Sequence, residues 1–479
     1  MKRNIRRDAL SGMIWRFAER FGAQGISFVV SIVLARLLDP SDYGLIAIVL
    51  VFITLSNVFV DSGLGTALIQ KKDTDNLDFS TVFYFNIFLC LLVYSVLFCT
   101  APFIASFYGK AQLCDVIRVL GVVIIISALK NVQQAYVSKH MLFRKFFFST
   151  LGGTIVAAIA GIVFAYNGFG VWALVAQQII NTLIDTIILW IIVRWRPART
   201  FSFQRLIQLV SFGWKLLVSA IINTVYDNLR QLIIGGVYTS EDLAYFNRGK
   251  QFPQLIITNI NSAIDSVLFP VMSSAQDDVQ RVKSMTRRSI QISSFIIWPC
   301  MMGLAAVAEP FIRLLLTEKW LFVVPFLRIF CVEYAFQPIH TANLNAIKAI
   351  GRSEIFLKLE IIKKLIGLAI VFISMHFGVM AMAISMLIYN MIAQIINSWP
   401  NRTLLNYGYR EQLKDIIPYI ILSLAMAIVV YCITFLHIVP ILTLFLQIVI
   451  GVIFYVSGAY LLKFESLEYV ISMVKSLKK

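Results

Sequence analysis

Leu38-Asp39-Pro40-Ser41-Asp42-Tyr43-Gly44 is a short polar break between two long apolar runs. About 200 residues later, Tyr238-Thr239-Ser240-Glu241-Asp242-Leu243-Ala244 stands in the same setting, and self-similarity at a fixed period indicates a repeated architecture. Further along, Val60-Asp61-Ser62-Gly63-Leu64 is matched by Ile264-Asp265-Ser266-Val267-Leu268. In an apolar chain, such a repeat is typical of transporters made from two related lobes.

The composition is that of a membrane protein. Of the 479 residues, 59% are hydrophobic and 14% are charged, and the mean hydropathy is +0.81. Soluble proteins contain about 25% charged residues. Apolar segments of about 20 residues, enough to cross a bilayer as a helix, recur about fourteen times. Their expected ranges are 13–37, 43–66, 80–107, 113–137, 146–166, 169–193, 208–236, 242–270, 289–315, 321–347, 354–375, 378–399, 415–437 and 439–461.

These segments predict an all-α polytopic membrane protein with about fourteen transmembrane helices. An even number of spans separates the two copies of the repeat, so both copies enter the membrane in the same direction and the lobes are parallel repeats. We expect one six-helix lobe over 1–200, a second over 201–400, and an added transmembrane hairpin with a cytoplasmic tail over 401–479.

The net charge of +17 is distributed along the chain in a way that indicates topology. About 27 lysines and arginines fall in alternate loops and at the termini, whereas the intervening loops offer essentially Lys110 and Lys319, which is a strong positive-inside bias. We therefore expect both termini in the cytoplasm. The same placement argues against nucleic-acid binding as the reason for the basic charge.

Polar residues within the spans are concentrated in the first two helices of each predicted lobe. Charge inside the membrane is costly, so these residues are expected to face a cavity or to pair with one another. Facing helix pairs of this kind would form a hydrophilic, net-cationic cleft between the lobes. The residues are Arg20, Lys215, Asn223, Asp227, Arg230, Arg248, Lys250, Gln254 and Asn261.

For several of these charges a simpler interpretation stays open. Arg20 lies near the cytoplasmic end of its span and can snorkel to the surface. Asp227 and Arg230 stand three residues apart and can satisfy one another. Arg248 and Lys250 are two residues apart and cannot share one helix face, so at least one is expected to point inward, and we favour Arg248.

Three further residues are candidates for a gate or for coupling. Asp61 and Asp265 stand at matching positions in the two repeats, where helix-end packing is the alternative to a gate contact. His340 follows Pro338 within an apolar span, where it has the chemistry to carry a coupling proton. A hydrogen bond to a neighbouring backbone carbonyl is the simpler role for this histidine.

Motifs for catalysis are missing from the sequence. It contains no HExxH, GxSxG or Walker GxxxxGK[ST] motif, and no long outer loop that would hold an active site. The six cysteines form neither a CxxC pair nor a cysteine–histidine cluster. We therefore expect no enzyme activity, no metal and no cofactor, and secondary transport or facilitated flipping remains.

Several segments together resemble the Wzx-type polysaccharide flippases of the multidrug/oligosaccharidyl-lipid/polysaccharide exporter superfamily, and within them the colanic-acid and teichuronic-acid exporter branch. The similarity covers nearly the whole chain in order. The stretches that carry it are Ser11-Gly12-Met13-Ile14-Trp15 with 34–44, Asp61-Ser62-Gly63-Leu64-Gly65 with 69–72, Ala244-Tyr245-Phe246-Asn247-Arg248, Leu268-Phe269-Pro270 and Thr317-Glu318-Lys319-Trp320.

This resemblance implies translocation of an undecaprenyl-diphosphate-linked oligosaccharide across the bacterial inner membrane by alternating access, for the synthesis of O-antigen, capsule or exopolysaccharide. The resemblance implies that the cations of the cleft bind the diphosphate and that the amides bind the sugars. The polyprenyl tail would stay in membrane lipid. A polysaccharide polymerase is a candidate partner, and the choice of coupling ion stays open between proton, sodium and none. The alternative is a small-molecule or drug-cation antiporter of the same superfamily, for which a cationic cleft is a poor match.

Overall fold

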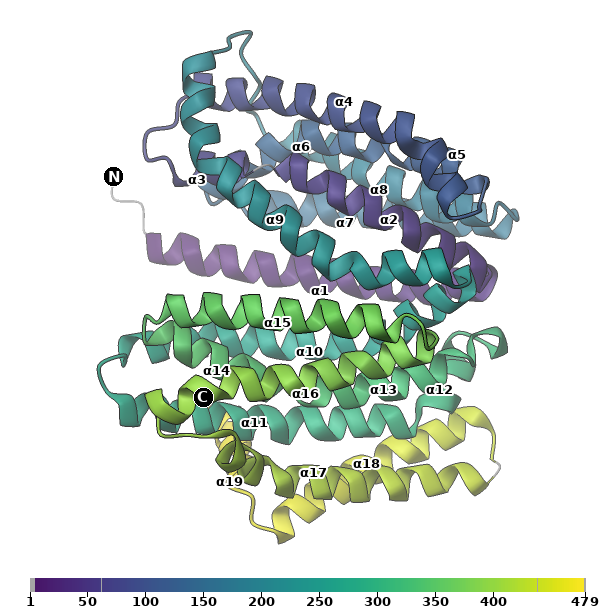
Figure 1. The fold of residues 1–479 in the computed structure, drawn as a ribbon, viewed down its shortest axis with the longest axis vertical. Coiled ribbons are helices and arrows are strands. Elements are labelled where there is room, and N and C mark those ends of the chain that lie inside the picture. Colours follow the sequence, from purple (N-terminus) through teal and green to yellow (C-terminus); the bar gives the residue numbers. More distant parts are fainter. Residues whose placement is uncertain (1–4, 62, 437, 478–479) are drawn as a thin grey trace. The chain divides into compact units, whose positions relative to one another are not determined.

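The computed structural model describes residues 5–61, 63–436 and 438–477, and every regular element within them is a helix (Figure 1). The predicted all-α fold class is therefore confirmed. Within this part of the chain, ten helices are long and apolar enough to cross a membrane. The number is eleven if the bent pair Phe203–Ser211 and Gly213–Val237 counts as one span. The predicted number of fourteen is not confirmed.

Charge and helix breaks explain the difference. α10 (Ser240–Ser274) and α15 (Ser353–Ser374) are long enough to span, but both carry several charged side chains. The predicted span 321–347 is divided into α13 (Val323–Ala335) and α14 (Gln337–Ala349). Pro338 stands in the first turn of α14, where its missing N–H costs no hydrogen bond, so the proline begins a new helix.

The chain forms two compact units, Met1–Ala244 and Tyr245–Lys479. α10 begins in the first unit and continues into the second. The predicted lobe limits near 200 and 400 describe the sequence repeat and stay a prediction. The helices of the first unit are α1 (Ile5–Leu37), α2 (Pro40–Asp61), α3 (Leu64–Gln70), α4 (Asn76–Phe107), α5 (Gln112–Leu120), α6 (Val122–Lys139), α7 (Arg144–Tyr166), α8 (Val171–Ile192) and α9 (Phe203–Val237). The second unit contains most of α10, then α11 (Val279–Ala306), α12 (Ala308–Leu315), η1 (Glu318–Trp320), α13, α14, α15, α16 (Val379–Leu404), α17 (Tyr409–Cys432), η2 (Ile433–Leu436), α18 (Pro440–Leu461) and α19 (Glu465–Leu477).

In the first unit, small residues let α7 and α8 pack closely along their length. Gly153, Ala157 and Gly161 recur every four residues on α7 and are buried, which places them on one helix face. A Cβ on Gly161 would lie only 3.1 Å from the Cβ of Gln177 on α8. Such small-residue faces are a common way to join helices in membranes, where the hydrophobic effect between helices is weak.

In the second unit, α11 packs along α17, and α17 packs against α18. These last two helices form the expected C-terminal pair. Aromatic rings fill the space between the three helices: the Phe295 ring lies 5.8 Å from that of Tyr419 and 5.4 Å from that of Tyr455. The Tyr455 hydroxyl donates a hydrogen bond to the Phe295 carbonyl at 2.9 Å, so this buried polar group is satisfied.

The repeated sequence forms the same local structure twice. The Asp42 carboxylate accepts a hydrogen bond from the backbone N–H of Asp39 at 3.3 Å where α2 begins. The Asp242 carboxylate accepts one from the backbone N–H of Thr239, also at 3.3 Å, where α10 begins. Both aspartates thus cap a helix start in the manner of a capping box, which confirms the repeat at this position.

Candidate functional site

The predicted site residues divide between the two compact units. Those in the first unit are Arg20, Asp61, Lys215, Asn223, Asp227 and Arg230, and those in the second are Arg248, Lys250, Gln254, Asn261, Asp265 and His340. The side chain of Asp265 lies outside the described residues. A joint arrangement of the two sets around one cleft stays a prediction, and each set is described within its own unit.

On α9, three predicted residues form an exposed polar row. Lys215, Asn223 and Asp227 all have exposed side chains, and their spacing of eight and four residues keeps them close to one face of the helix. Arg230 continues this sequence and is half-buried. Groups of this polarity on a span-length helix do not face hydrocarbon, so this face of α9 meets water or protein.

Near the start of α1, the charges serve different roles. Arg16 forms an ion pair with Glu19 at 3.0 Å, and its guanidinium lies 4.2 Å from the centre of the Phe146 ring on α7. Glu19 also accepts a hydrogen bond from Thr150 at 3.1 Å. Arg20 instead has an exposed side chain. Arg16 and Glu19 therefore attach α1 to α7, whereas Arg20 is accessible to a ligand.

Two polar connections join the second, fourth and sixth spans of the first unit. The Asn131 amide donates to the Asp61 carboxylate at 3.1 Å, which links α6 to α2. The neighbouring Lys130 ammonium lies 2.9 Å from the Asp185 carboxylate on α8. The side chains of Lys130 and Asp185 are only 18% and 12% exposed, so this ion pair is held largely away from water.

The second unit has the same connections between the equivalent helices. Asn261 on α10 donates to the Thr341 hydroxyl on α14 at 3.2 Å. His340 Nδ1 lies 2.7 Å from the Asn397 amide nitrogen on α16. A side-chain amide is thus the observed partner of His340, not the backbone carbonyl considered from the sequence.

Helix ends fix the correspondence between these pairs. Lys130 and His340 lie the same number of residues before Met141 (φ 54°) and Gly351 (φ 79°), the left-handed residues that follow α6 and α14. Counted from Pro40 and Ser240, Asp61 of α2 corresponds to Asn261 of α10, not to Asp265. Each unit thus joins the same two helices of the repeat by a polar contact, an ion pair in the first unit and a histidine–amide pair in the second. Asn397 lies 19 residues after Gly378, whereas Asp185 lies 15 residues after Gly170, so the partners on α8 and α16 stand one helical turn apart.

Arg248 is buried within the second unit. Its side chain hydrogen-bonds to the Gln251 amide oxygen at 2.6 Å, and its guanidinium lies 5.6 Å from the centre of the Trp320 ring. Arg248 is only 6% exposed, whereas Lys250 is half-buried and Gln254 exposed. The guanidinium is thus held by protein groups, and its role in diphosphate binding stays a prediction.

The sequence analysis missed several of these polar residues. Lys130 and Asp185 are charged residues inside the predicted spans 113–137 and 169–193. Because charge is rare within spans, this position alone could have identified them as candidates. On α16, carboxamides recur with helical spacing, and all but the first are buried: Asn390, Gln394, Asn397 and Asn401. Carboxamides repeated along one face of an apolar helix could likewise have identified this face of α16 as a candidate polar site.

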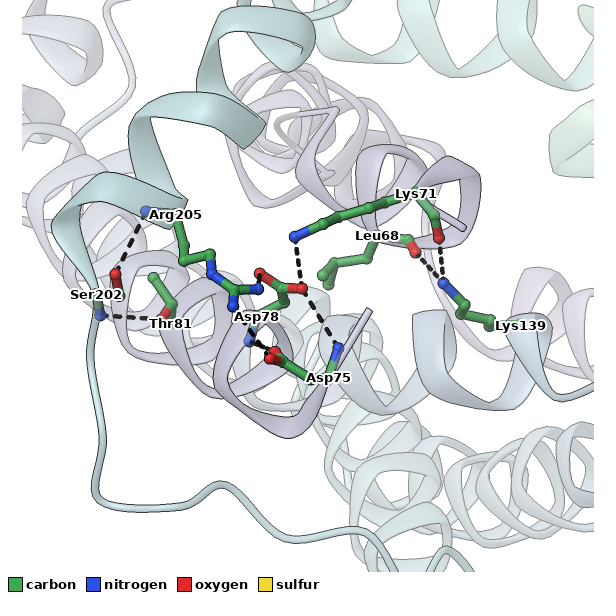
Figure 2. Close-up of polar contacts among 8 residues, drawn as sticks. All are labelled: Leu68, Lys71, Asp75, Asp78, Thr81, Lys139, Ser202 and Arg205. Atoms are coloured by element: carbon green, nitrogen blue, oxygen red, sulfur yellow. Dashed lines mark hydrogen bonds and ion pairs between the residues drawn. The ribbon is translucent and has the colours of Figure 1, made fainter. Parts of the chain in front are cut away.

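A third cluster of charges lies where α4 and α9 begin (Figure 2). The Asp78 carboxylate is fully buried and pairs with Lys71 at 2.7 Å and with Arg205 at 3.0 Å. Asp75 caps α4 by accepting a hydrogen bond from the backbone N–H of Asp78. This hydrogen bond lowers the pKa of the Asp75 carboxyl, and the positive charges of Arg205 and Lys71 lower it further. The cluster holds the segment between α8 and α9 against the rest of the first unit. Among the described residues there is no group of three histidine, cysteine, aspartate or glutamate side chains arranged to hold a metal ion.

Comparison with known proteins gives a consistent result. A family model described as polysaccharide biosynthesis protein matches residues 33–325. The lipopolysaccharide biosynthesis protein WzxC of Escherichia coli (strain K12) is 23% identical over 440 residues, which cover 89% of each chain. The teichuronic acid biosynthesis protein TuaB of Bacillus subtilis (strain 168) is 24% identical, with 74% of this chain and 73% of TuaB covered.

Among solved structures, the lipid II flippase MurJ in an inward closed conformation superposes with a TM-score of 0.77. The sequence identity is 15%, and the superposition covers 94% of this chain and 98% of MurJ. At this identity the comparison establishes a shared fold. The resemblance inferred from the sequence is therefore confirmed by family and by fold.

Proposed function

Because this chain belongs to the family of polysaccharide biosynthesis proteins and is a multi-pass membrane protein with the fold of MurJ, we propose that it is a flippase. Its proposed substrate is an undecaprenyl-diphosphate-linked oligosaccharide, which it moves from the cytoplasmic to the outer leaflet of the bacterial inner membrane. WzxC and TuaB, which are named for lipopolysaccharide and teichuronic acid biosynthesis, support a substrate of this class. The protein carries out no covalent step in this proposal.

The observation that carries the proposal is the exposed polar row of α9. A lipid-linked oligosaccharide has a hydrophilic head that must cross the hydrocarbon layer, and its transporter needs polar groups at membrane depth. Lys215 is suited to a phosphate, and Asn223 is suited to sugar hydroxyls, with exposed side chains on one span-length helix. A helix that only packed against lipid would place apolar residues at these positions.

We assign the remaining predicted residues on the same chemical basis. Cations hold the diphosphate because charge-assisted hydrogen bonds to phosphate oxygens are strong where water is scarce. Amides hold the sugars. The proposed diphosphate residues are Arg20, Lys215, Arg230, Arg248 and Lys250, and the proposed sugar residues are Asn223, Gln254 and Asn261.

The polar connections are proposed to control the transport cycle. Asp61, bonded to Asn131, and His340, bonded to Asn397, each join two helices of one unit, so they would help each unit to move as a body in alternating access. A coupling proton or sodium ion would act by changing these contacts, and Asp227 and Asp265 are further candidates for this role. The basic alternate loops support termini in the cytoplasm. A polysaccharide polymerase is a proposed partner, and it would meet the substrate only after translocation is complete.

A flipping assay with purified protein tests the proposal. Proteoliposomes would contain a dye-labelled undecaprenyl-diphosphate oligosaccharide, and a membrane-impermeant reductant would report the labelled head that reaches the outer leaflet. We expect the wild-type protein to accelerate this exchange, Lys215→Ala to slow it at least tenfold, and Lys72→Ala, at an exposed loop lysine, to leave it unchanged. Exchange no faster than in protein-free liposomes would overturn the proposal.

The antiporter alternative is tested in cells. A deletion strain is expected to lose surface polysaccharide while its sensitivity to cationic drugs stays unchanged. Increased drug sensitivity with normal surface polysaccharide would favour the antiporter instead.

A further inference from the structure

The second unit contains a cavity of about 690 Å³ that none of the proposed transport residues lines. One wall is formed by the first half of α11, where Ser284, Arg287, Arg288 and Gln291 lie on one helix face. The other walls are the start of α17 and the turn that joins α18 to α19. α11, α17 and α18 are each long and apolar enough to cross a membrane, and the cavity lies where all three reach the same end. It is therefore placed at the depth of lipid headgroups.

The lining of this cavity has an excess of positive charge. Four cationic side chains, Arg287, Arg288, Lys414 and Lys463, face two carboxylates, Asp415 and Glu465. Asp415 is already neutralised, because it pairs with Arg287 at 2.6 Å and accepts the Tyr407 hydroxyl at 2.7 Å.

The other three cations are directed at the cavity without an acidic partner. Within the part of the chain that the structure describes, Arg288, Lys414 and Lys463 form no ion pair. Arg288 is held over the Tyr469 ring, with its guanidinium carbon 3.9 Å from the ring centre, which fixes the direction of its donors. The chain's own last residues are a poor occupant, since 475–479 contain three lysines and no acid.

The backbone at Lys463 gives an independent indication. Lys463 has a φ of 54°, in the left-handed region that favours glycine, and it lies in the turn closed by the hydrogen bond from the Phe464 N–H to the Ala459 carbonyl at 3.0 Å. Lysine in this conformation costs more than glycine would. The turn places its side chain in the lining of the cavity.

Two aromatic side chains, Tyr419 and Phe464, also line the cavity. The Tyr419 ring meets the Phe464 ring edge-on at 5.0 Å, and the Tyr419 hydroxyl is satisfied by Ser466 at 2.8 Å. The cavity thus combines cationic with aromatic side chains at a membrane surface. This combination matches a group that carries a phosphate next to aliphatic carbon.

We propose that this cavity binds the phosphate headgroup of an anionic glycerophospholipid, with Arg288, Lys414 and Lys463 as its ligands. The bound lipid bridges α11, α17 and the α18–α19 turn, so it stabilises the C-terminal helix pair. Basic pockets between transmembrane helices are a known mode of anionic lipid recognition. The site is separate from the transported substrate, and its test does not depend on transport.

Lipid titration of the full-length protein in detergent micelles, followed by microscale thermophoresis, tests the site. The three titrants are short-chain phosphatidylglycerol, short-chain phosphatidylcholine and inorganic phosphate. We expect phosphatidylglycerol to bind at least tenfold more tightly than either of the others. Equal binding of phosphatidylcholine would overturn the proposal, and so would inorganic phosphate that binds as tightly as the lipid, because the site would then take a soluble anion.

Two variants separate binding from folding. Lys463→Gly suits the left-handed backbone, so its melting temperature without lipid is expected to equal or exceed that of the wild type. Together with Lys414→Ala it should weaken phosphatidylglycerol binding at least fivefold, whereas Lys72→Ala, outside the cavity, should not. A stable double variant with wild-type lipid affinity would overturn the assignment.

Discussion

The Lys130 ammonium lies 2.9 Å from the Asp185 carboxylate and joins α6 to α8 within the first unit. Between the equivalent helices of the second unit, His340 and Asn397 join α14 to α16 at 2.7 Å without a formal ion pair. The repeat has therefore kept the connection between its fourth and sixth spans and changed its charge. An ion pair in a largely dry setting is sensitive to the loss of one partner, which makes this the first place to test.

Breaking this ion pair from one side should destabilise the protein strongly. Asp185→Asn leaves the Lys130 ammonium without a countercharge and is expected to lower the free energy of unfolding by about 3 kcal/mol. The double variant Lys130→Met/Asp185→Leu removes both charges and should recover most of that loss. Thermal unfolding in detergent measures both effects. A flipping assay on the double variant then separates the roles: normal flipping means that the pair only joins helices, and loss of flipping in a stable protein means that its charge serves the transport cycle.

The contact between the two copies of the repeated stretch depends on glycine. A Cβ at Gly44 would overlap the backbone carbonyl of Ser240, so Gly44→Ala must displace main chain and should cost about 2–3 kcal/mol. Gly25→Ala is the matched control, because nothing lies within 4 Å of its Cβ position on α1. There alanine should stabilise the helix by about 0.5–1 kcal/mol. Equal melting temperatures for the two variants would contradict this interpretation.

Acid should destabilise the first unit partly through Asp75. The pKa of its carboxyl is lowered in the folded state, first by the hydrogen bond from the Asp78 backbone N–H. A group whose pKa is lowered on folding stabilises the protein above its unfolded pKa, and that contribution is lost as the pH falls through the folded value, here below about pH 4.

Asp75→Asn isolates this contribution. Asparagine is also a good N-cap, so stability at pH 7 should change little, while the melting temperature should fall less steeply between about pH 5 and pH 3. Asp73→Asn, in the same exposed loop, is the control. An unchanged acid slope in Asp75→Asn would show that other carboxylates account for the acid sensitivity.

Arg248 tests whether a buried guanidinium takes part in transport. Arg248→Ala is expected to slow flipping at least tenfold per folded protein, because both the charge and the flat surface over Trp320 are lost. Arg248→Lys keeps the charge but not the stacking, so an intermediate rate is expected. Normal flipping by Arg248→Ala would remove this residue from the proposed diphosphate site.

The sequence alone was sufficient for those features that depend on local chemistry. Apolar runs predicted an all-helical membrane protein, and the repeated polar stretch predicted two equivalent helix starts, which the caps at Asp42 and Asp242 confirm. Each of these signals is contained within a few neighbouring residues, so composition and spacing were enough.

Only the tertiary structure decided which polar residues meet. Lys130 and Asp185 are 55 residues apart, and their contact depends on how α6 and α8 rotate about their axes as they pack. Spacing along α10 favoured Arg248 as the inward-pointing residue, but it could not reveal that the Trp320 ring is its partner. The rotation of a helix is set by the side chains of its neighbours, which come from distant parts of the chain. Thus the sequence determined the helices and their duplication, and packing between helices determined the partners of the charges within them.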